Sequence, residues 1–106
     1  MKLNRKIRDI LDILRGCGAE KVHLFGSWAR DEADETSDLD VVVIMPSQSP
    51  FLSRMQQIGR SLPLSMGAVD ILAYTPEEWR TMLAEGNAFA EMVMEEGKVL
   101  YEKQPC

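Results

Sequence analysis

The sequence predicts a mixed α/β (α+β) fold in which helices flank one mixed β-sheet. Three features predict it: a helix-periodic apolar stripe opens the chain, three strand-like apolar runs follow, and helical segments lie between or after these runs. The 106 residues are 45% hydrophobic and 27% charged, which is ordinary for a globular protein. A chain of this length can bury a core without staples, so we expect residues 1–106 to form a single domain.

The first half of the chain is predicted to hold one helix and two strands. Apolar residues spaced as on one helix face predict an amphipathic helix over residues 3–15. The alternating segment 21–25 predicts a strand, after which a short helical turn begins near Ser27. Residues 38–45 form a nearly continuous apolar run, which predicts a central strand covered on both faces.

The second half is predicted to hold three helices and two strands. Residues 51–59 favour a helix, although Ser, Pro and Gly around it make this part the hardest to interpret. Residues 68–74 predict a third strand and residues 99–101 a last short one. Two helices lie between these strands, and Asn87 is a candidate cap for the second.

The best-defined boundary is the start of the helix that follows residues 68–74. Thr75 is a suitable N-cap, Pro76 suits the first helical position, and Glu78 completes a capping box. This pattern predicts a helix that begins directly after the third strand.

Composition excludes several function classes. No apolar run approaches the roughly 20 residues that span a bilayer, and charges interrupt the N-terminal stripe, unlike in a signal peptide. We therefore expect a cytoplasmic protein without a membrane segment. The net charge of -5 and the lack of a basic stripe argue against general nucleic-acid binding. Cys17 and Cys106 form no CxxC pair, so we expect free thiols.

Acidic residues gather in one stretch, because residues 31–40 contain six acids and no base. Four of these acids are interpreted as a solvated loop: Asp31, Glu32, Asp34 and Glu35. The other two, Asp38 and Asp40, stand at the start of the predicted central strand. At positions i and i+2 of a strand they project from one face, with Cα atoms roughly 6 to 7 Å apart. Both carboxylates could then reach one metal centre.

Asp70 is the natural third metal ligand. It lies between Val69 and Ile71 in an otherwise apolar strand, where an unpaired carboxylate would be costly. Oxygen-only ligands suit Mg²⁺ or Mn²⁺, and two such ions can hold the attacking and leaving oxygens of a phosphoryl or nucleotidyl transfer. Asp70 is also placed to take up the proton of the acceptor hydroxyl.

Gly26 and Ser27 form a candidate phosphate site at the end of the first strand. The backbone N–H groups of a turn and a small hydroxyl can receive a phosphate, and glycine lets it approach the main chain. Combined with the three aspartates, this site predicts in-line displacement of pyrophosphate from a nucleoside triphosphate.

Each of these residues also has a plainer interpretation. Asp38 with Ser37 could form a turn, Ser27 could be a helix N-cap, and Asp70 could be a structural hydrogen-bond acceptor. Their occurrence together favours the functional interpretation.

Other candidate residues are weaker. His23, the single histidine, is interpreted as a structural residue of its strand and not as a base or ligand. Trp28 either stacks on a base or partner, or packs beside the motif. The methionines are interpreted as filler of the core or of an interface, namely Met55, Met66, Met82, Met92 and Met94.

Residues 26–43, with the sequence GSWARDEADETSDLDVVV, strongly resemble the GSxARG…SDxDL signature of the minimal nucleotidyltransferases. This group is the small branch of the DNA polymerase β-like superfamily. The first helix, the VDIL strand followed by TPEEW, and the closing EEGKVLY are also similar, so the resemblance covers nearly the whole chain.

The resemblance implies a minimal polymerase-β-like nucleotidyltransferase fold and a role for each motif residue. Gly26 and Ser27 would bind the triphosphate of ATP, Asp38 and Asp40 would hold two Mg²⁺ ions, and Asp70 would complete the catalytic triad.

Two positions beside the signature are less clear. Arg30 is balanced between a nucleotide contact and a salt bridge to the neighbouring acids. Asp31 stands where the family usually has glycine, and its charge could weaken triphosphate binding.

The short length implies a protein partner that presents the acceptor, since no acceptor-binding helical domain fits in 106 residues. Stand-alone minimal nucleotidyltransferases resemble antitoxins of HEPN-domain ribonucleases, and some of them transfer AMP to a tyrosine of the toxin. The leading hypothesis is therefore a protein adenylyltransferase that acts as an antitoxin. The alternative is an antitoxin that occludes its partner and has little or no activity, and Asp31 motivates it. Transfer to a small molecule or an RNA end is less favoured, because the acceptor domain is missing and the surface is acidic.

Overall fold

The computed structural model describes residues 2–32, 38–63, 67 and 69–103. In chain order its elements are α1 (Lys2–Gly16), β1 (Lys21–Phe25), the 3-10 helix η1 (Gly26–Trp28), β2 (Leu39–Ile44), α2 (Phe51–Ser61), β3 (Val69–Tyr74), α3 (Pro76–Ala84), α4 (Ala88–Glu96) and β4 (Lys98–Glu102). This is the predicted order of elements. At most ends, the observed bounds of an element differ from the predicted ones by one or two residues. The observed β2 begins at Leu39, so Asp38 directly precedes it.

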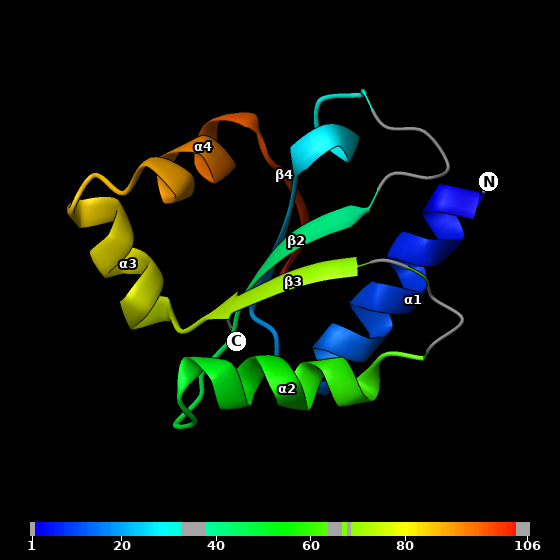
Figure 1. Cartoon of the computed structure of the whole chain (residues 1–106), viewed down its shortest axis with the longest axis horizontal. Coiled ribbons are helices and arrows are strands. Elements are labelled where there is room, and N and C mark those ends of the chain that lie inside the picture. Colours follow the sequence, from blue (N-terminus) through cyan, green and yellow to red (C-terminus); the bar gives the residue numbers. More distant parts are fainter. Residues whose placement is uncertain (1, 33–37, 64–66, 68, 104–106) are drawn as a thin grey trace.

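The strands form one mixed sheet in the order β3-β2-β1-β4 (Figure 1). β2 pairs with β3 in parallel, whereas β1 pairs with both β2 and β4 in antiparallel fashion. The predicted central position of β2 is confirmed, because it has a strand on each side and five of its six residues are buried. Among the strands that the structure describes, β3 lies at an edge of the sheet and has β2 as its only strand neighbour.

Helices cover the sheet on both faces. In Figure 1, α3 and α4 lie to the left of the sheet and α1 to its right, with α2 below. One core cluster joins α1 and α2 to the sheet through residues such as Ile10 and Val41, and the other joins α3 and α4 to it through residues such as Val42 and Trp79. Alternate residues of β2 therefore serve opposite cores. This arrangement confirms the predicted mixed sheet flanked by helices.

Two observations concern the helices and the cysteines. Within the part of the chain that the structure describes, no helix combines the length and apolarity needed to cross a membrane. Cys17 is a free, half-buried thiol, and Cys106 lies outside the described residues.

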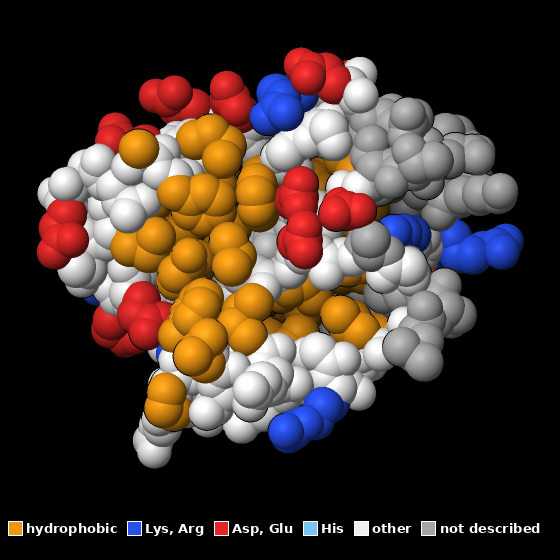
Figure 2. Space-filling model, in the orientation of Figure 1, with side chains coloured by type: hydrophobic (Ala, Val, Ile, Leu, Met, Phe, Trp, Pro, Cys, Tyr) orange, Lys and Arg blue, Asp and Glu red, His pale blue; other side chains and the backbone are white. Residues whose placement is uncertain are grey.

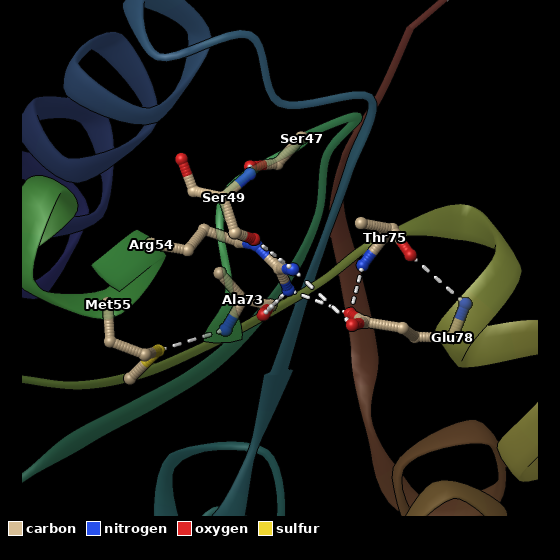
Figure 3. Close-up of polar contacts among 7 residues, drawn as sticks. All are labelled: Ser47, Ser49, Arg54, Met55, Ala73, Thr75 and Glu78. Atoms are coloured by element: carbon tan, nitrogen blue, oxygen red, sulfur yellow. Dashed lines mark hydrogen bonds and ion pairs between the residues drawn. The ribbon is translucent and has the colours of Figure 1, made fainter. Parts of the chain in front are cut away.

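A buried arginine joins α2 to the end of β3 and the start of α3 (Figure 3). Nη1 of Arg54 donates to the carbonyl oxygen of Ala73 and to Oε1 of Glu78, both at 2.7 Å, and Nη2 donates to the carbonyl oxygen of Ser49 at 3.0 Å. The sulfur of Met55 accepts from the N–H of Ala73 at 3.3 Å. The hydrogen bonds of Arg54 are charge-assisted, and such bonds are about twice as strong as neutral ones. α2 thus takes the place of a missing strand at one point of the β3 edge.

The predicted capping box at the start of α3 is present. The Thr75 hydroxyl accepts from the N–H of Glu78 at 3.1 Å, and the Glu78 carboxylate accepts from the N–H of Thr75 at 2.8 Å. The hydrogen bond from Arg54 lowers the pKa of the Glu78 carboxyl, and the bonds from Thr75 act in the same direction. Asn87 also caps its helix as predicted, accepting from the N–H of Ala90 at 3.0 Å.

We expect Arg54→Ala to lower the free energy of unfolding by about 2–4 kcal/mol, because it leaves buried acceptors without their charged donor. Urea unfolding monitored by circular dichroism measures this change. Arg60→Ala removes an exposed arginine of the same helix and is the matched control. A loss of similar size in both variants would show that Arg54 has no special role.

We expect the stability difference between the wild type and Glu78→Gln to shrink as pH falls. A carboxyl whose pKa is lowered by folding stabilises the fold above its ordinary pKa of about 4.3, and loses that contribution as pH drops through the folded value. Denaturant unfolding at several values between about pH 7 and pH 3 tests this. Glu77→Gln, at an exposed neighbouring carboxyl, is the control, and a constant difference for Glu78→Gln would contradict the prediction.

Candidate active site

Two of the predicted site aspartates are direct neighbours in the sheet. Asp40 of β2 is the register partner of Asp70 of β3, and parallel pairing points both side chains to the face that carries α3 and α4. Asp38 lies one residue before β2 and is exposed. In Figure 2, acidic side chains gather near the middle of the face drawn, directly beside hydrophobic ones. The sheet therefore brings carboxylates 30 positions apart in the sequence to one place.

The carboxylates interact electrostatically with one another. Partial burial, a hydrogen bond with the Asp70 carboxyl and the charges of Asp70 and Asp38 raise the pKa of Asp40, whereas the charge of Arg30 acts in the opposite direction. Like charges held this close favour the binding of a proton or a cation.

Asp70 differs from the sequence prediction in its burial. Its apolar neighbours predicted a buried carboxylate that would need a partner, but the structure shows that Asp70 is exposed. The reason is that β3 is an edge strand, whose residues on this face are not fully covered. The position of Asp70 beside Asp40, and not a cost of burial, makes it a candidate ligand.

Gly26 brings the start of η1 against the carboxylates. Its φ of +75° is favourable for glycine alone, and a Cβ atom there would overlap Oδ2 of Asp40. Phe25, the residue before it, is the register partner of Asp40 in β2. The predicted phosphate-binding pair of Gly26 and Ser27 therefore lies at the same end of the strands as the aspartates.

Arg30 and Asp31 both form ion pairs at the surface. Arg30 lies 3.5 Å from Glu32 and 3.9 Å from Glu96, as its salt-bridge interpretation predicts. Asp31 has a φ of +58°, which explains why glycine suits this position, and its carboxylate lies 3.6 Å from Lys98. Asp31 and Glu32 are exposed, as a solvated loop predicts, whereas Asp34, Glu35 and Ser37 lie outside the described residues.

The three aspartates fit a hard divalent cation by their chemistry. All donors are carboxylate oxygens, as Mg²⁺ and Mn²⁺ prefer, and a cation would neutralise the negative charges of Asp38 and Asp70 that act on Asp40. As the side chains stand, however, no group of three His, Cys, Asp or Glu residues among those described is set to hold an ion. On the chemistry of their donors, Asp38, Asp40 and Asp70 are the residues that would hold one.

The weaker candidates lie away from this site or pack beside it. His23 is 2% exposed and its ring lies 6.0 Å from that of Trp79, and burial lowers its pKa. Trp28 is half-buried and packs against the core. Met55, Met82 and Met92 pack against the cores, whereas Met94 is 47% exposed and Met66 lies outside the described residues.

A cleft of about 550 Å³ beside Asp40 and Asp70 was not predicted from the sequence. It opens between β3 and the second half of α2, and it is lined mainly by apolar side chains, namely Phe25, Met55, Ile58, Leu62, Val69, Ile71, Leu72 and Phe89, together with Gly59. The helical spacing of Met55, Ile58 and Leu62 was the available signal. It could show an apolar helix face but not the gap beside it.

Comparison with known proteins identifies the family. The model of the nucleotidyltransferase domain family matches residues 4–103 of this chain. The chain belongs to that family. It is therefore a nucleotidyltransferase. The fold and the class of activity that the signature residues implied are confirmed.

Individual relatives agree with this assignment. A Methanocaldococcus jannaschii protein named "Putative protein adenylyltransferase" is 44% identical over 75 residues, which cover 70% of this chain and 80% of the relative. A structure described as a minimal nucleotidyltransferase is 28% identical and has a TM-score of 0.64, covering 92% of this chain and 91% of that one. A crystal structure described as a toxin–antitoxin with AMP-PNP is 22% identical, covers 92% and 74% of the two chains, and has a TM-score of 0.65.

We expect Gly26→Ala to abolish nucleotidyl transfer and to lower stability by about 1–2 kcal/mol, because the new methyl group strains the backbone and displaces the Asp40 carboxylate. Gly18→Ala is the matched control: Gly18 also has a positive φ, of +95°, but no atom lies within 4 Å of an added Cβ. Thermal unfolding and a transfer assay with labelled nucleotide separate the two effects. Equal activity in both variants would refute the role of the Gly26–Asp40 contact.

Proposed function

We propose that this nucleotidyltransferase transfers AMP from ATP, with Mg²⁺, to a tyrosine hydroxyl of a HEPN-type toxin and thereby acts as its antitoxin in the cytoplasm. The alignment of Asp40 with Asp70 next to Gly26 is the single observation that supports the reaction most directly. The name of the Methanocaldococcus jannaschii relative supports a protein acceptor, and the toxin–antitoxin structure with AMP-PNP supports a toxin partner and an adenine nucleotide.

In the proposed reaction the acceptor oxygen attacks the α-phosphorus of ATP. A new oxygen–phosphorus bond forms, the bond from the α-phosphorus to its bridging oxygen breaks, and pyrophosphate leaves. Asp70 accepts the proton of the hydroxyl, and Asp38 and Asp40 would hold the metal. When bound, Mg²⁺ neutralises charge on the phosphate oxygens.

The backbone turn and Arg30 would orient the triphosphate. Gly26 leaves the main chain open to a phosphate, and Ser27 follows it at the start of η1. The ion pairs of Arg30 are long and its side chain is 42% exposed, so exchanging them for a phosphate costs little. We therefore assign two roles to Arg30. It forms surface salt bridges before ATP binds, and it contacts a phosphate group of ATP afterwards.

We expect Asp38→Asn and Asp40→Asn each to reduce transfer by more than about a hundredfold, since even residues behind metal ligands contribute tenfold to a hundredfold. Asp12→Asn, at an exposed aspartate of α1, is the control. The measurement is the intact mass of the protein encoded next to this one, after incubation with Mg²⁺ and each ribonucleoside triphosphate in turn. Transfer that survives in both site variants would disprove the assigned roles.

The second candidate function is an antitoxin that occludes its partner without transfer. It is favoured by Asp31, which places a carboxylate where the family usually has glycine and holds a φ of +58°. The double variant Asp38→Asn/Asp40→Asn discriminates between the two functions in cells that express the partner. Protection by the double variant supports occlusion, and loss of protection with a retained fold supports transfer.

A further inference from the structure

We propose that the free edge of β3 binds an extended segment of the acceptor protein, which adds to the sheet as a further strand and presents its hydroxyl beside Asp70. This inference rests on the proposed transfer reaction and adds to it the conformation and place of the acceptor. It follows from the backbone of β3, from the cleft beside it and from one glycine of α2.

Successive residues of β3 direct their backbone N–H and carbonyl groups to opposite sides of the strand. The carbonyl of Tyr74 faces β2, where it accepts from the N–H of Met45 at 2.9 Å. Ala73 faces the other way, since Arg54 and Met55 of α2 contact its carbonyl and its N–H. Two residues earlier, Ile71 must therefore also point its N–H and carbonyl away from β2.

The outward backbone groups of Ile71 have no hydrogen-bond partner among the residues that the structure describes. α2 satisfies the edge only at Ala73, so a stretch without hydrogen-bond partners precedes that point; Ile71 is 6% exposed, and its outward backbone groups are reached through the cleft. Backbone groups of this kind need a partner, and an unpaired strand edge is a template for another strand. Their partner can be water, or the backbone of an extended peptide.

The cleft fits such a peptide. One wall is β3 from Val69 to Leu72, and the opposite wall is α2 with Met55 and Ile58, followed by Leu62 directly after the helix. In Figure 2 a hollow with hydrophobic atoms inside it separates the acidic side chains from the helix below. Peptide groups on one side and apolar side chains on the other are what strand addition uses, the first for affinity and the second for specificity.

Gly59 keeps the α2 wall of the cleft open. It lies inside a helix, where glycine is a poor residue, and it does not have a positive φ. No atom lies within 4 Å of an added Cβ, so packing does not require glycine there. The space that the missing side chain leaves belongs to the cleft, whose lining includes Gly59.

An added strand would bring a hydroxyl to the carboxylates. Neighbouring strands lie about 4.8 Å apart, and side chains directly opposite one another on one face have Cβ atoms about 5 Å apart. A tyrosine on the added strand, opposite Asp70 and on the same face, would therefore reach the group that takes its proton. This arrangement gives a reason for the exposure of Asp70 at the sheet edge.

The test uses the full chain and the peptide acetyl-Lys-Val-Tyr-Val-Thr-Lys-amide as a probe. Amide hydrogen exchange followed by NMR compares Ile71 with Leu72, whose N–H points into the sheet. We expect Ile71 to exchange at least about tenfold faster than Leu72 in the free chain, and the peptide to slow Ile71 about tenfold. An Ile71 amide already protected without peptide, by a second copy or by the chain itself, would overturn the inference.

Two controls separate strand addition from other binding. The same peptide with N-methylated backbone amides keeps its charges but loses its donors, and Gly59→Leu fills the cleft with a better helix former. We expect both to abolish the protection of Ile71, whereas Gly59→Ala retains it. Protection that survives both changes would refute strand addition at this edge.

Transfer to a protein acceptor, measured with the same variants, distinguishes the inference from the proposed function. Asp38-dependent transfer at an unchanged rate in Gly59→Leu would overturn the inference and leave the proposed function intact. Protection of Ile71 without any Asp38-dependent transfer would support the docking edge and count against the proposed reaction.

Discussion

The buried guanidinium of Arg54 constrains the whole edge of the molecule that carries the site. A buried charge is tolerated only when it is paired and hydrogen-bonded. The two Nη atoms of Arg54 meet this need through two carbonyl groups and Glu78, whereas its buried Nε has no partner among the described residues. Those partners belong to the segment before α2, the end of β3 and the first turn of α3. Because no described strand pairs with the outer side of β3, this cluster fixes how α2 lies along it and where the cleft opens.

The register of β2 and β3 turns that scaffold into a site. Parallel strands paired residue for residue set Asp40 opposite Asp70, and a slip of one residue would move Asp70 to the opposite face. Apolar residues of both strands hold the register, because Val41 and Ile71 belong to one core and Val42 and Leu72 to the other. Packing on the two faces thus decides the spacing of the charged groups.

Much of this could be predicted from the sequence, because local signals agree with the fold. Periodicity and the Thr75–Glu78 capping box gave the order of elements, and the signature gave the family. Arg54 could not be predicted, since an arginine on an amphipathic helix normally faces water and its partners lie 19 and 24 residues away. The exposure of Asp70 depends on the strand order, which the apolar residues on either side of it do not encode.

The close approach of Gly26 to Asp40 joins the phosphate turn and the carboxylates into one mechanical unit. A residue at position 26 and a residue at position 40 share the same space, so substitutions at the two positions will not be additive. Any side chain at 26 is strained by the positive φ, and it avoids the overlap only when 40 becomes smaller, an exchange that removes a carboxylate. The residue at position 26 therefore cannot change unless the carboxylate at position 40, and with it the chemistry of the site, changes too.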